Sequence, residues 1–246
     1  VLSFLYEGYR LAKKAKTYKD TSIVVTTSPP FLPFWCGLLF DKKMDWGVWF
    51  FDLFPEFFFS YKTFKNQSFY KIIEKQTYKN SPKFIIALGP KQAEFIQQKY
   101  NKNIPYLTLP CGVFFYQHKS NSRPAWRETD KIILGYCGNF SEAHNLNFIR
   151  AVVDNLDANK FQLVLALYGV NANHIRAYAR DKAGVVLVEN VPRSQLHFID
   201  IHLVTLMSNW THIAVPSKAV SAISLGSTIL FCGSQESDNW HLLNEA

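Results

Sequence analysis

Apolar residues along the chain form short runs that alternate with segments of helical periodicity. Runs that are apolar at successive positions predict strands buried on both faces. Apolar residues recurring every three to four positions predict amphipathic helices between them. Strands are predicted at 22–27, 46–51, 83–88, 105–109, 131–136, 161–168, 185–190, 200–206 and 227–232. Helices are predicted at about 31–40, 68–78, 91–100, 146–156, 172–180 and 217–225, with a short one after Pro192 and helical patterns at both ends of the chain.

This alternation predicts parallel sheets with helices on both sides, because consecutive parallel strands need a crossover connection. Residues 112–130 lose the pattern and collect Gly, Pro, Ser and Asn. We therefore predict an N-terminal domain at 1–114, a linker at 115–130 and a C-terminal domain at 131–246. The expected fold class is α/β, with two Rossmann-like doubly wound parallel-sheet domains facing each other. Ligands of such folds bind at the carboxyl ends of the strands, so the loops after strands should carry the chemistry.

Composition and charge limit the kinds of molecule that the protein is expected to bind. The 246 residues are 48% hydrophobic and carry a net charge of +8, which is ordinary for a globular protein. Residues 1–130 hold 19 Lys and Arg against 10 Asp and Glu, so the basic character lies in the first half. A solvated basic face and an anionic membrane surface both fit this charge, whereas the Arg-rich clusters of a nucleic-acid-binding module are absent from the sequence.

Targeting and metal signals are weak. No apolar run in the sequence reaches the roughly 20 residues that a membrane-spanning helix needs. The four cysteines are scattered without zinc-ligand spacing, which favours a reducing, cytoplasmic compartment. Because the sequence opens with Val1 inside a helical pattern and stops in another, we expect a protein truncated at both ends.

Five motifs follow one another in the loops: TTSPP (26–30), DLFPE (52–56), LPCGV (109–113), GYCGNFSEAHN (135–145) and VPSKAVSAISLG (215–226). Together they resemble glycosyltransferases of the GT-B architecture, particularly the retaining family 4 enzymes of bacterial surface polysaccharides. The resemblance covers nearly the whole chain. It implies that residues 1–114 form the acceptor-side domain and that residues 131–246 form the nucleotide-sugar-binding domain, both incomplete. It implies a hexosyltransferase that is independent of metal ions and other cofactors, and the sequence indeed lacks an Asp-x-Asp motif.

The last two motifs predict an anion site. Gly135 and Gly138 allow the backbone to approach a ligand closely, and a helix that starts near Asn145 would point free N–H groups at it. In the other motif Ser217 can cap a helix and Lys218 places a cation where a diphosphate would lie. The alternative is an ordinary strand-to-helix turn with a capped helix.

The resemblance assigns donor-binding roles to six residues of the second domain: Gly138, Asn139, His144, Ser217, Lys218 and Glu236. For His144, contact with donor or acceptor and a purely local role in orienting its loop are both open.

On the acceptor side, Asp52 and Glu56 are the candidate catalytic carboxylates, placed at a cleft edge to bind an acceptor hydroxyl or stabilise an oxocarbenium-like sugar. A helix-capping aspartate with an exposed glutamate is the alternative. Thr27 and Ser28 offer hydroxyls for acceptor binding beside a rigid Pro-Pro turn, and they equally fit a turn without a ligand.

The motifs also depart from the family pattern. Ser221 stands where many relatives carry a ribose-binding Glu, and Asn139 and Asn145 stand where some carry basic residues. Glu236 or Asp238 could supply the lost acidic contact.

The expected activity is transfer of a sugar from a UDP- or GDP-linked donor to a lipid-linked or polysaccharide acceptor. The expected location is the cytoplasm, peripheral on the inner face of the cell membrane and in contact with its anionic surface. A nucleotide-sugar epimerase of similar form and a non-catalytic truncated relative are the competing hypotheses.

Overall fold

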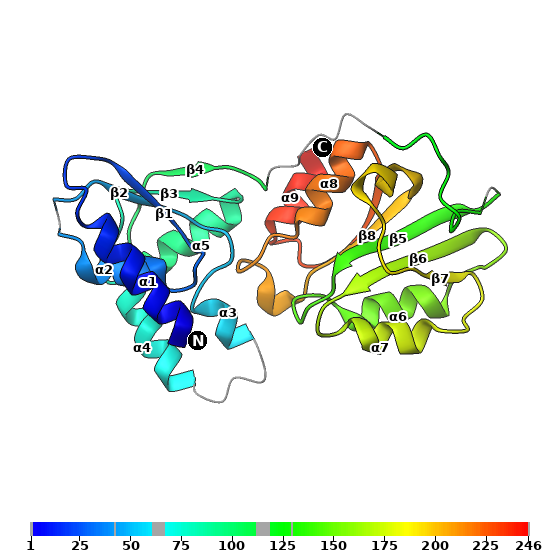
Figure 1. Cartoon of the computed structure of the whole chain (residues 1–246), viewed down its shortest axis with the longest axis horizontal. Coiled ribbons are helices and arrows are strands. Elements are labelled where there is room, and N and C mark those ends of the chain that lie inside the picture. Colours follow the sequence, from blue (N-terminus) through cyan, green and yellow to red (C-terminus); the bar gives the residue numbers. More distant parts are fainter. Residues whose placement is uncertain (1, 42, 61–66, 112–118, 129, 246) are drawn as a thin grey trace. The chain divides into compact units, whose positions relative to one another are not determined.

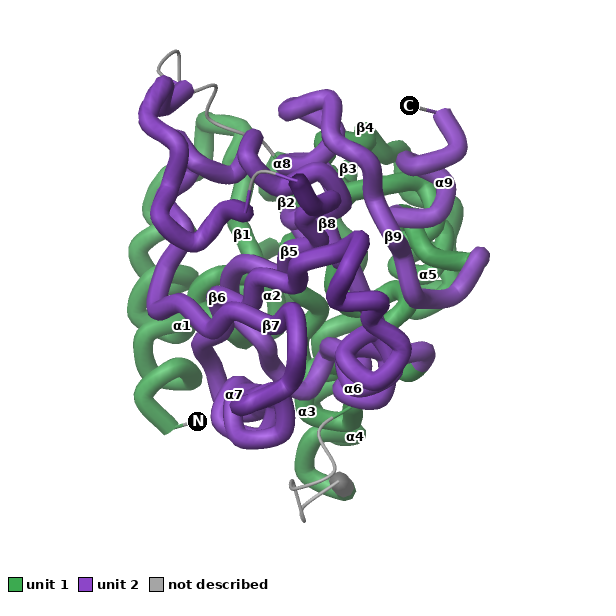
Figure 2. The backbone as a smooth tube through the Cα atoms, turned by 90° about the vertical axis from the view of Figure 1, so that its right-hand side faces the viewer, with its two compact units in different colours: residues 1–111, 209–215, 236–238 green, residues 112–208, 216–235, 239–246 purple. Residues whose placement is uncertain are grey.

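The chain divides into two compact units, which Figure 2 distinguishes by colour. The computed structural model describes residues 2–41, 43–60, 67–111, 119–128 and 130–245. The first unit contains Val1–Cys111, Asn209–Val215 and Glu236–Asp238, and the second contains Gly112–Ser208, Pro216–Gln235 and Asn239–Ala246. Two short segments of the predicted C-terminal domain thus pack with the first unit.

The first unit is built on a four-stranded parallel sheet (Figure 1). Its strands follow chain order: β1 (Ile23–Thr26), β2 (Trp46–Trp49), β3 (Phe84–Ala87) and β4 (Tyr106–Thr108). Each strand pairs in register with the next, from Ile23 opposite Trp46 to Ala87 opposite Thr108. The carboxyl ends of all four strands therefore lie at the same end of this sheet. Loop 26–30, which follows β1, and loop 52–56, which follows β2, belong to that end.

Within its described residues, the first unit contains five helices: α1 (Leu2–Ala15), α2 (Leu32–Leu39), α3 (Glu56–Ser60), α4 (Gln67–Thr77) and α5 (Pro90–Tyr100). Aromatic side chains join three of these segments, because Phe58 stacks on Phe31 at 5.5 Å and on Tyr70 at 4.6 Å between ring centroids. The apolar stretch 31–40 contributes Phe31, Leu32 and Cys36 to the core.

The second unit has a five-stranded parallel sheet in the order β7-β6-β5-β8-β9. Its strands are β5 (Ile132–Asn139), β6 (Phe161–Tyr168), β7 (Val185–Leu187), β8 (Ile201–Thr205) and β9 (Thr228–Cys232). The order reverses between β5 and β8, which makes this pair the topological switch point of a doubly wound sheet.

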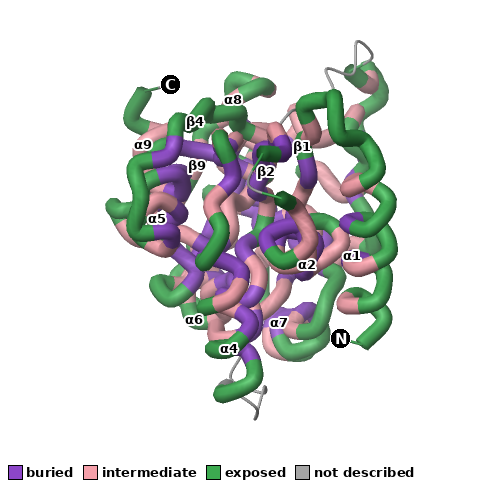
Figure 3. The backbone as a smooth tube through the Cα atoms, turned by 90° about the vertical axis from the view of Figure 1, so that its left-hand side faces the viewer, coloured by how far each residue is buried: buried purple, intermediate pink, exposed green. Residues whose placement is uncertain are grey.

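Apolar layers cover both faces of this sheet. Leu134 and Tyr136 of β5 belong to one layer, which also contains Ile149 and Ile175 from the helices on that side. Ile133 belongs to the other layer, because successive side chains of a strand point to opposite faces of the sheet. The helical segments are α6 (Leu146–Asp154), α7 (Ala172–Ala179), η1 (Arg193–Phe198), η2 (Ser208–Trp210), α8 (Ser217–Leu225) and α9 (Asp238–Glu245). Burial differs between the strands: residues 162–167 of β6 are buried, whereas β4 is exposed, as its colour in Figure 3 shows.

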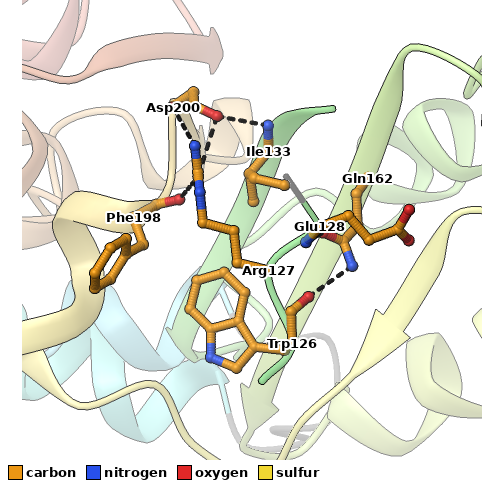
Figure 4. A network of polar contacts seen from close by, with 7 residues as sticks. All are labelled: Trp126, Arg127, Glu128, Ile133, Gln162, Phe198 and Asp200. Carbon is orange, nitrogen blue, oxygen red and sulfur yellow. Dashed lines mark hydrogen bonds and ion pairs between the residues drawn. The ribbon is translucent and has the colours of Figure 1, made fainter. Parts of the chain in front are cut away.

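Part of the predicted linker packs onto the second sheet rather than standing free (Figure 4). The guanidinium of Arg127 bonds both carboxylate oxygens of Asp200 at 3.3 Å, and Asp200 accepts a 2.8 Å hydrogen bond from Ile133 N. The Gln162 amide donates to Trp126 O at 2.7 Å, and Trp126 packs against the core. Residues 112–118 lie outside the described part of the chain.

The predicted fold class is confirmed: the chain is α/β with two Rossmann-like parallel sheets. All nine predicted strands and the predicted helices are present, and β6 and α8 have the predicted bounds. The main difference is β5, which continues through Asn139 and so carries Gly138 at its end, where the sequence predicted a loop from Cys137 onward.

Candidate functional site

The candidate donor site lies at the switch point of the second sheet, where loops follow β5 and β8. The end of β5 supplies Gly138 and Asn139, and α8 after β8 supplies Ser217 and Lys218. The fold therefore gathers these four predicted residues at the position where doubly wound sheets bind ligands.

Lys218 holds its ammonium over this position. Its Nζ donates a 3.1 Å hydrogen bond to Asn139 O and lies 5.1 Å from the ring centroid of Tyr136. Among the described residues no carboxylate forms an ion pair with Lys218. Burial lowers the pKa of Lys218 to about 8. A partly desolvated cation without a counter-ion is suited to bind an anion.

The absence of a side chain at Gly138 leaves room for the Lys218 side chain. The residue has φ +121°, a conformation that side chains disfavour, and a Cβ atom there would lie 3.2 Å from Lys218 Cε. Gly169, after β6, has φ +107°, and its Cβ would come 2.2 Å from Asn139 Oδ1. Two glycines thus keep the backbone around Asn139 tightly packed and leave the ammonium close to the main chain.

The two helix N-termini differ. Asn145 caps α6, since its Oδ1 accepts from the amides of Asn147 and Phe148 at 3.0 and 3.2 Å. The prediction that α6 offers these amides to a ligand is therefore wrong. Helix α8 has Pro216 at its N-cap and no side-chain cap bond. The expected cap by Ser217 is likewise wrong, because Ser217 is the first helical residue and is exposed.

His144 closes the turn after β5. Its Nδ1 accepts a hydrogen bond from Ser141 N at 3.0 Å, and its ring stacks on Phe140 at 5.6 Å. Burial and the nearby Lys218 lower the pKa of His144 to about 3, so the imidazole is neutral at pH 7. With Nδ1 as the acceptor, the proton of the neutral ring is on Nε2. The observed contacts are those of a loop-orienting residue, and contact with a donor stays a prediction.

The acidic residues after β9 belong to the first unit. Glu236 is exposed in the segment Glu236–Asp238, and its donor-binding role stays a prediction. Asp238 is 5% exposed and caps α5, accepting from Lys91 N and Gln92 N at 2.8 Å each. The residues around Asp238 do not indicate this capping role, although Gly89 before Pro90 offers no capping side chain of its own and so signals a need for one.

The acceptor-side hydroxyls are placed differently from each other. Thr27 is 3% exposed, and its Oγ1 accepts a 3.0 Å hydrogen bond from Phe51 N. Its hydroxyl therefore links the ends of β1 and β2. Ser28 is exposed just beyond it, before a cis peptide bond to Pro29. Of the two, Ser28 has the accessible hydroxyl.

The two candidate carboxylates also separate. Asp52 is exposed in the loop after β2, as predicted. Glu56 is 3% exposed, so its predicted place at a cleft edge is wrong. Burial raises the pKa of Glu56, and Lys99 Nζ of α5 lies 3.7 Å from its Oε1 while also bonding Glu74 of α4. The Lys99 ammonium of α5 therefore lies between the carboxylates of Glu56 on α3 and Glu74 on α4.

No helix in the described part of the chain has both the length and the apolarity to cross a membrane.

Comparisons with known proteins identify the fold. No family model matches the sequence, and no curated protein matches it. Sucrose-phosphate synthase from Thermosynechococcus elongatus is similar in structure, with a TM-score of 0.61 and 15% identity over 94% of this chain and 62% of that one. The N-terminal domain of trehalose-6-phosphate phosphatase from Candida albicans gives 0.58 and 11% over 99% of this chain and 62% of that one.

A glycosyltransferase from Rickettsia africae gives a TM-score of 0.51 and 11% identity, over 95% of this chain and 64% of that one. At these identities the likeness shows the fold alone, which is that of GT-B proteins. The chain spans 62% of the length of the first two structures.

Proposed function

We propose that this chain is the core of a glycosyltransferase that binds a nucleotide sugar at the ends of β5 and β8. The observation that carries the proposal is the ammonium of Lys218. It lies 3.1 Å from Asn139 O, has no carboxylate partner among the described residues, and stands at the start of a helix without a side-chain cap. A diphosphate supplies the missing counter-charge, and sugar nucleotides combine that group with a transferable sugar.

In this proposal the ammonium acts on the leaving group. Breaking the bond between the sugar and the diphosphate develops negative charge on the departing oxygen. Lys218 and the N-terminal dipole of α8 stabilise that charge from fixed positions, which lowers the barrier without reorganisation of the site. With Lys218 in this role, the proposed reaction needs no metal ion to stabilise the leaving group. Retention of the sugar's configuration is proposed only from the resemblance of the motifs to family 4 enzymes.

The acceptor is proposed to be a lipid-linked or polysaccharide sugar. On the first unit, Asp52 and Ser28 are exposed in the loops that follow β2 and β1. We assign to them the polar contacts with the acceptor. Thr27 and Glu56 are left with structural roles in this proposal, because both are 3% exposed.

The similarity in fold to a sucrose-phosphate synthase and to a glycosyltransferase supports the proposal. The donor is proposed to be linked to UDP or GDP.

The test is turnover of a panel of UDP- and GDP-sugars. The quantity measured is the release of nucleoside diphosphate, with and without sugar acceptors. We expect release by the wild-type protein and a loss of at least tenfold in Lys218→Met. Lys160→Met is the matched control, because Lys160 has a 75% exposed side chain on the same unit. Release of no diphosphate from any donor contradicts the proposal. If the protein, incubated with the nucleotide sugar and no acceptor, changes the configuration of the sugar, it is an epimerase instead.

A further inference from the structure

Helix α1 of the first unit carries two different faces. The inner face packs on α2, where Gly8 and Ala12 are buried and Trp35 Nε1 donates a 2.8 Å hydrogen bond to Leu5 O. Tyr9 adds an edge-to-face contact with Trp35 at 5.2 Å. These contacts of the inner face hold the helix on the first unit.

The outer face bears large apolar side chains that the fold leaves in solvent. Phe4, Leu11 and Tyr18 recur at intervals of seven residues, so the first two form one stripe along α1 and the third follows just beyond its end. Their exposed fractions are 42%, 48% and 51%. Leu2 and Tyr6, exposed at 84% and 62%, lie along the opposite margin of the outer face, because Leu2 is about two and a half helical turns from Leu11. Figure 3 shows how much of this helix is exposed.

Shallow hollows run beside the stripe. One of about 700 Å³ is lined by Phe4, Arg10 and Leu11 together with Pro29 and Pro30. A second, of about 510 Å³, continues past Leu11 to Tyr18. Within the described residues, therefore, the stripe is open along its length.

The charge beside the stripe is positive. Residues 1–20 contain Arg10 and four lysines (Lys13, Lys14, Lys16 and Lys19) against Glu7 and Asp20. In the described part of the chain, none of these five basic residues forms an ion pair. Arg10 lies 5.8 Å from the ring of Tyr6 and Lys14 lies 5.6 Å from that of Tyr18, so cations and aromatic rings alternate on this surface.

We propose that this outer face of α1, with residues 16–19 after it, docks on an anionic membrane surface. Exposed Phe, Leu and Tyr side chains along the margins of a helix face rich in Lys and Arg suit a helix that lies in the plane of a bilayer interface. The apolar side chains enter the interfacial layer, and the basic side chains meet anionic headgroups. The inference is independent of the donor site, which belongs to the other unit.

The test is co-sedimentation of the full chain with phosphatidylglycerol-containing vesicles and with pure phosphatidylcholine vesicles. We expect binding to the anionic vesicles only, weakening as NaCl is raised. Lys14→Gln should weaken binding about fivefold, because one basic residue near an anionic surface contributes about 1 kcal/mol. Leu11→Ser should weaken binding as well, through the loss of apolar burial.

Ile72→Ser and Lys160→Gln are the matched controls. Ile72 is 69% exposed on α4 and Lys160 has a 75% exposed side chain, so both are as tolerant of change as the test positions. Both controls should bind vesicles like the wild type. Circular dichroism and the nucleotide-binding assay check that the variants remain folded.

Three results overturn the proposal: no binding to anionic vesicles, equal binding to both kinds of vesicle, or equal weakening by the control variants. A light-scattering measurement could give a fourth result that overturns the proposal. A dimer that Leu11→Ser converts to a monomer would show that a second copy, rather than a membrane, covers the stripe.

Discussion

Lys218 Nζ donates a 3.1 Å hydrogen bond to Asn139 O, across the point where the strand order of the second sheet reverses. The two residues are 79 positions apart in the sequence. Their meeting joins the two motifs that separately suggested an anion site, and it gives the proposed donor site a cation and a defined backbone geometry.

The titration of Lys218 predicts how nucleotide binding depends on pH. Its pKa is lowered to about 8 by burial, so the ammonium is present below pH 8 and is lost above it. Affinity for UDP or GDP should therefore be highest below pH 8 and fall as the pH rises through that value. Lys218→Arg should keep its affinity to higher pH, because a guanidinium stays protonated. Calorimetric titration between pH 6.5 and 9.5 measures both profiles, and a flat wild-type profile would contradict the assignment.

Gly138→Ala should damage the site and the fold together. At φ +121° an alanine is strained, and its Cβ would press on Lys218 Cε at 3.2 Å. We expect a loss of about 1–3 kcal/mol in the free energy of unfolding and weaker nucleotide binding. Gly226→Ala is the control, because Gly226 has φ +69° with nothing within 4 Å of the added Cβ. Urea denaturation should show a smaller loss for the control and unchanged nucleotide binding. Equal nucleotide affinity in both variants would contradict the packing of Gly138 against Lys218.

Glu56 should make stability fall as the pH rises. Its pKa is raised in the folded state by burial, so the folded protein holds this proton more tightly than the unfolded chain does. The resulting stabilisation is present below the ordinary Glu pKa and is lost as pH rises through the folded value. Glu56→Gln removes the titration, so the stability of this variant relative to wild type should increase from pH 4.5 to pH 7. Urea denaturation at several pH values measures the difference, and a difference independent of pH would refute the buried acid.

The contact between Arg127 and Asp200 predicts that the segment before β5 is part of the second unit's stability. Asp200→Ala removes the partner of Arg127 and leaves Ile133 N without its 2.8 Å acceptor. We expect a loss of about 1–3 kcal/mol in the free energy of unfolding. Asp157→Ala provides a comparison, since the ion pair of Asp157 with Lys160 is local and exposed. Thermal unfolding that affects both variants equally would show that the Arg127 contact adds nothing.

The sequence predicted the architecture well because its information is local. Strands such as 161–168 are apolar at successive positions, and the helix at 217–225 is bounded by Pro216 and Gly226, so a short window defines each. The strand order was not readable in this way, and neither was the convergence of Asn139 with Lys218 until the motifs were compared with a known family.

The errors concern side chains whose partners are distant in sequence. Asp238 caps a helix that starts 148 residues earlier, at Pro90, and no local pattern announces that pairing. Glu56 was expected at a cleft edge because it lies close to Asp52 in the DLFPE motif, yet it is followed by three phenylalanines, which was a usable signal of burial. Ser217 satisfied the sequence preference for a helix cap, but Pro216 took that position.

The most direct test of the account is calorimetric titration of UDP and GDP into the wild-type chain, Lys218→Met and Lys160→Met at pH 7. We predict binding of at least one nucleotide by the wild type and the Lys160 variant, and affinity at least tenfold weaker in Lys218→Met. Binding that is absent from the wild type, or equal in all three proteins, would contradict the claim that Lys218 holds a diphosphate.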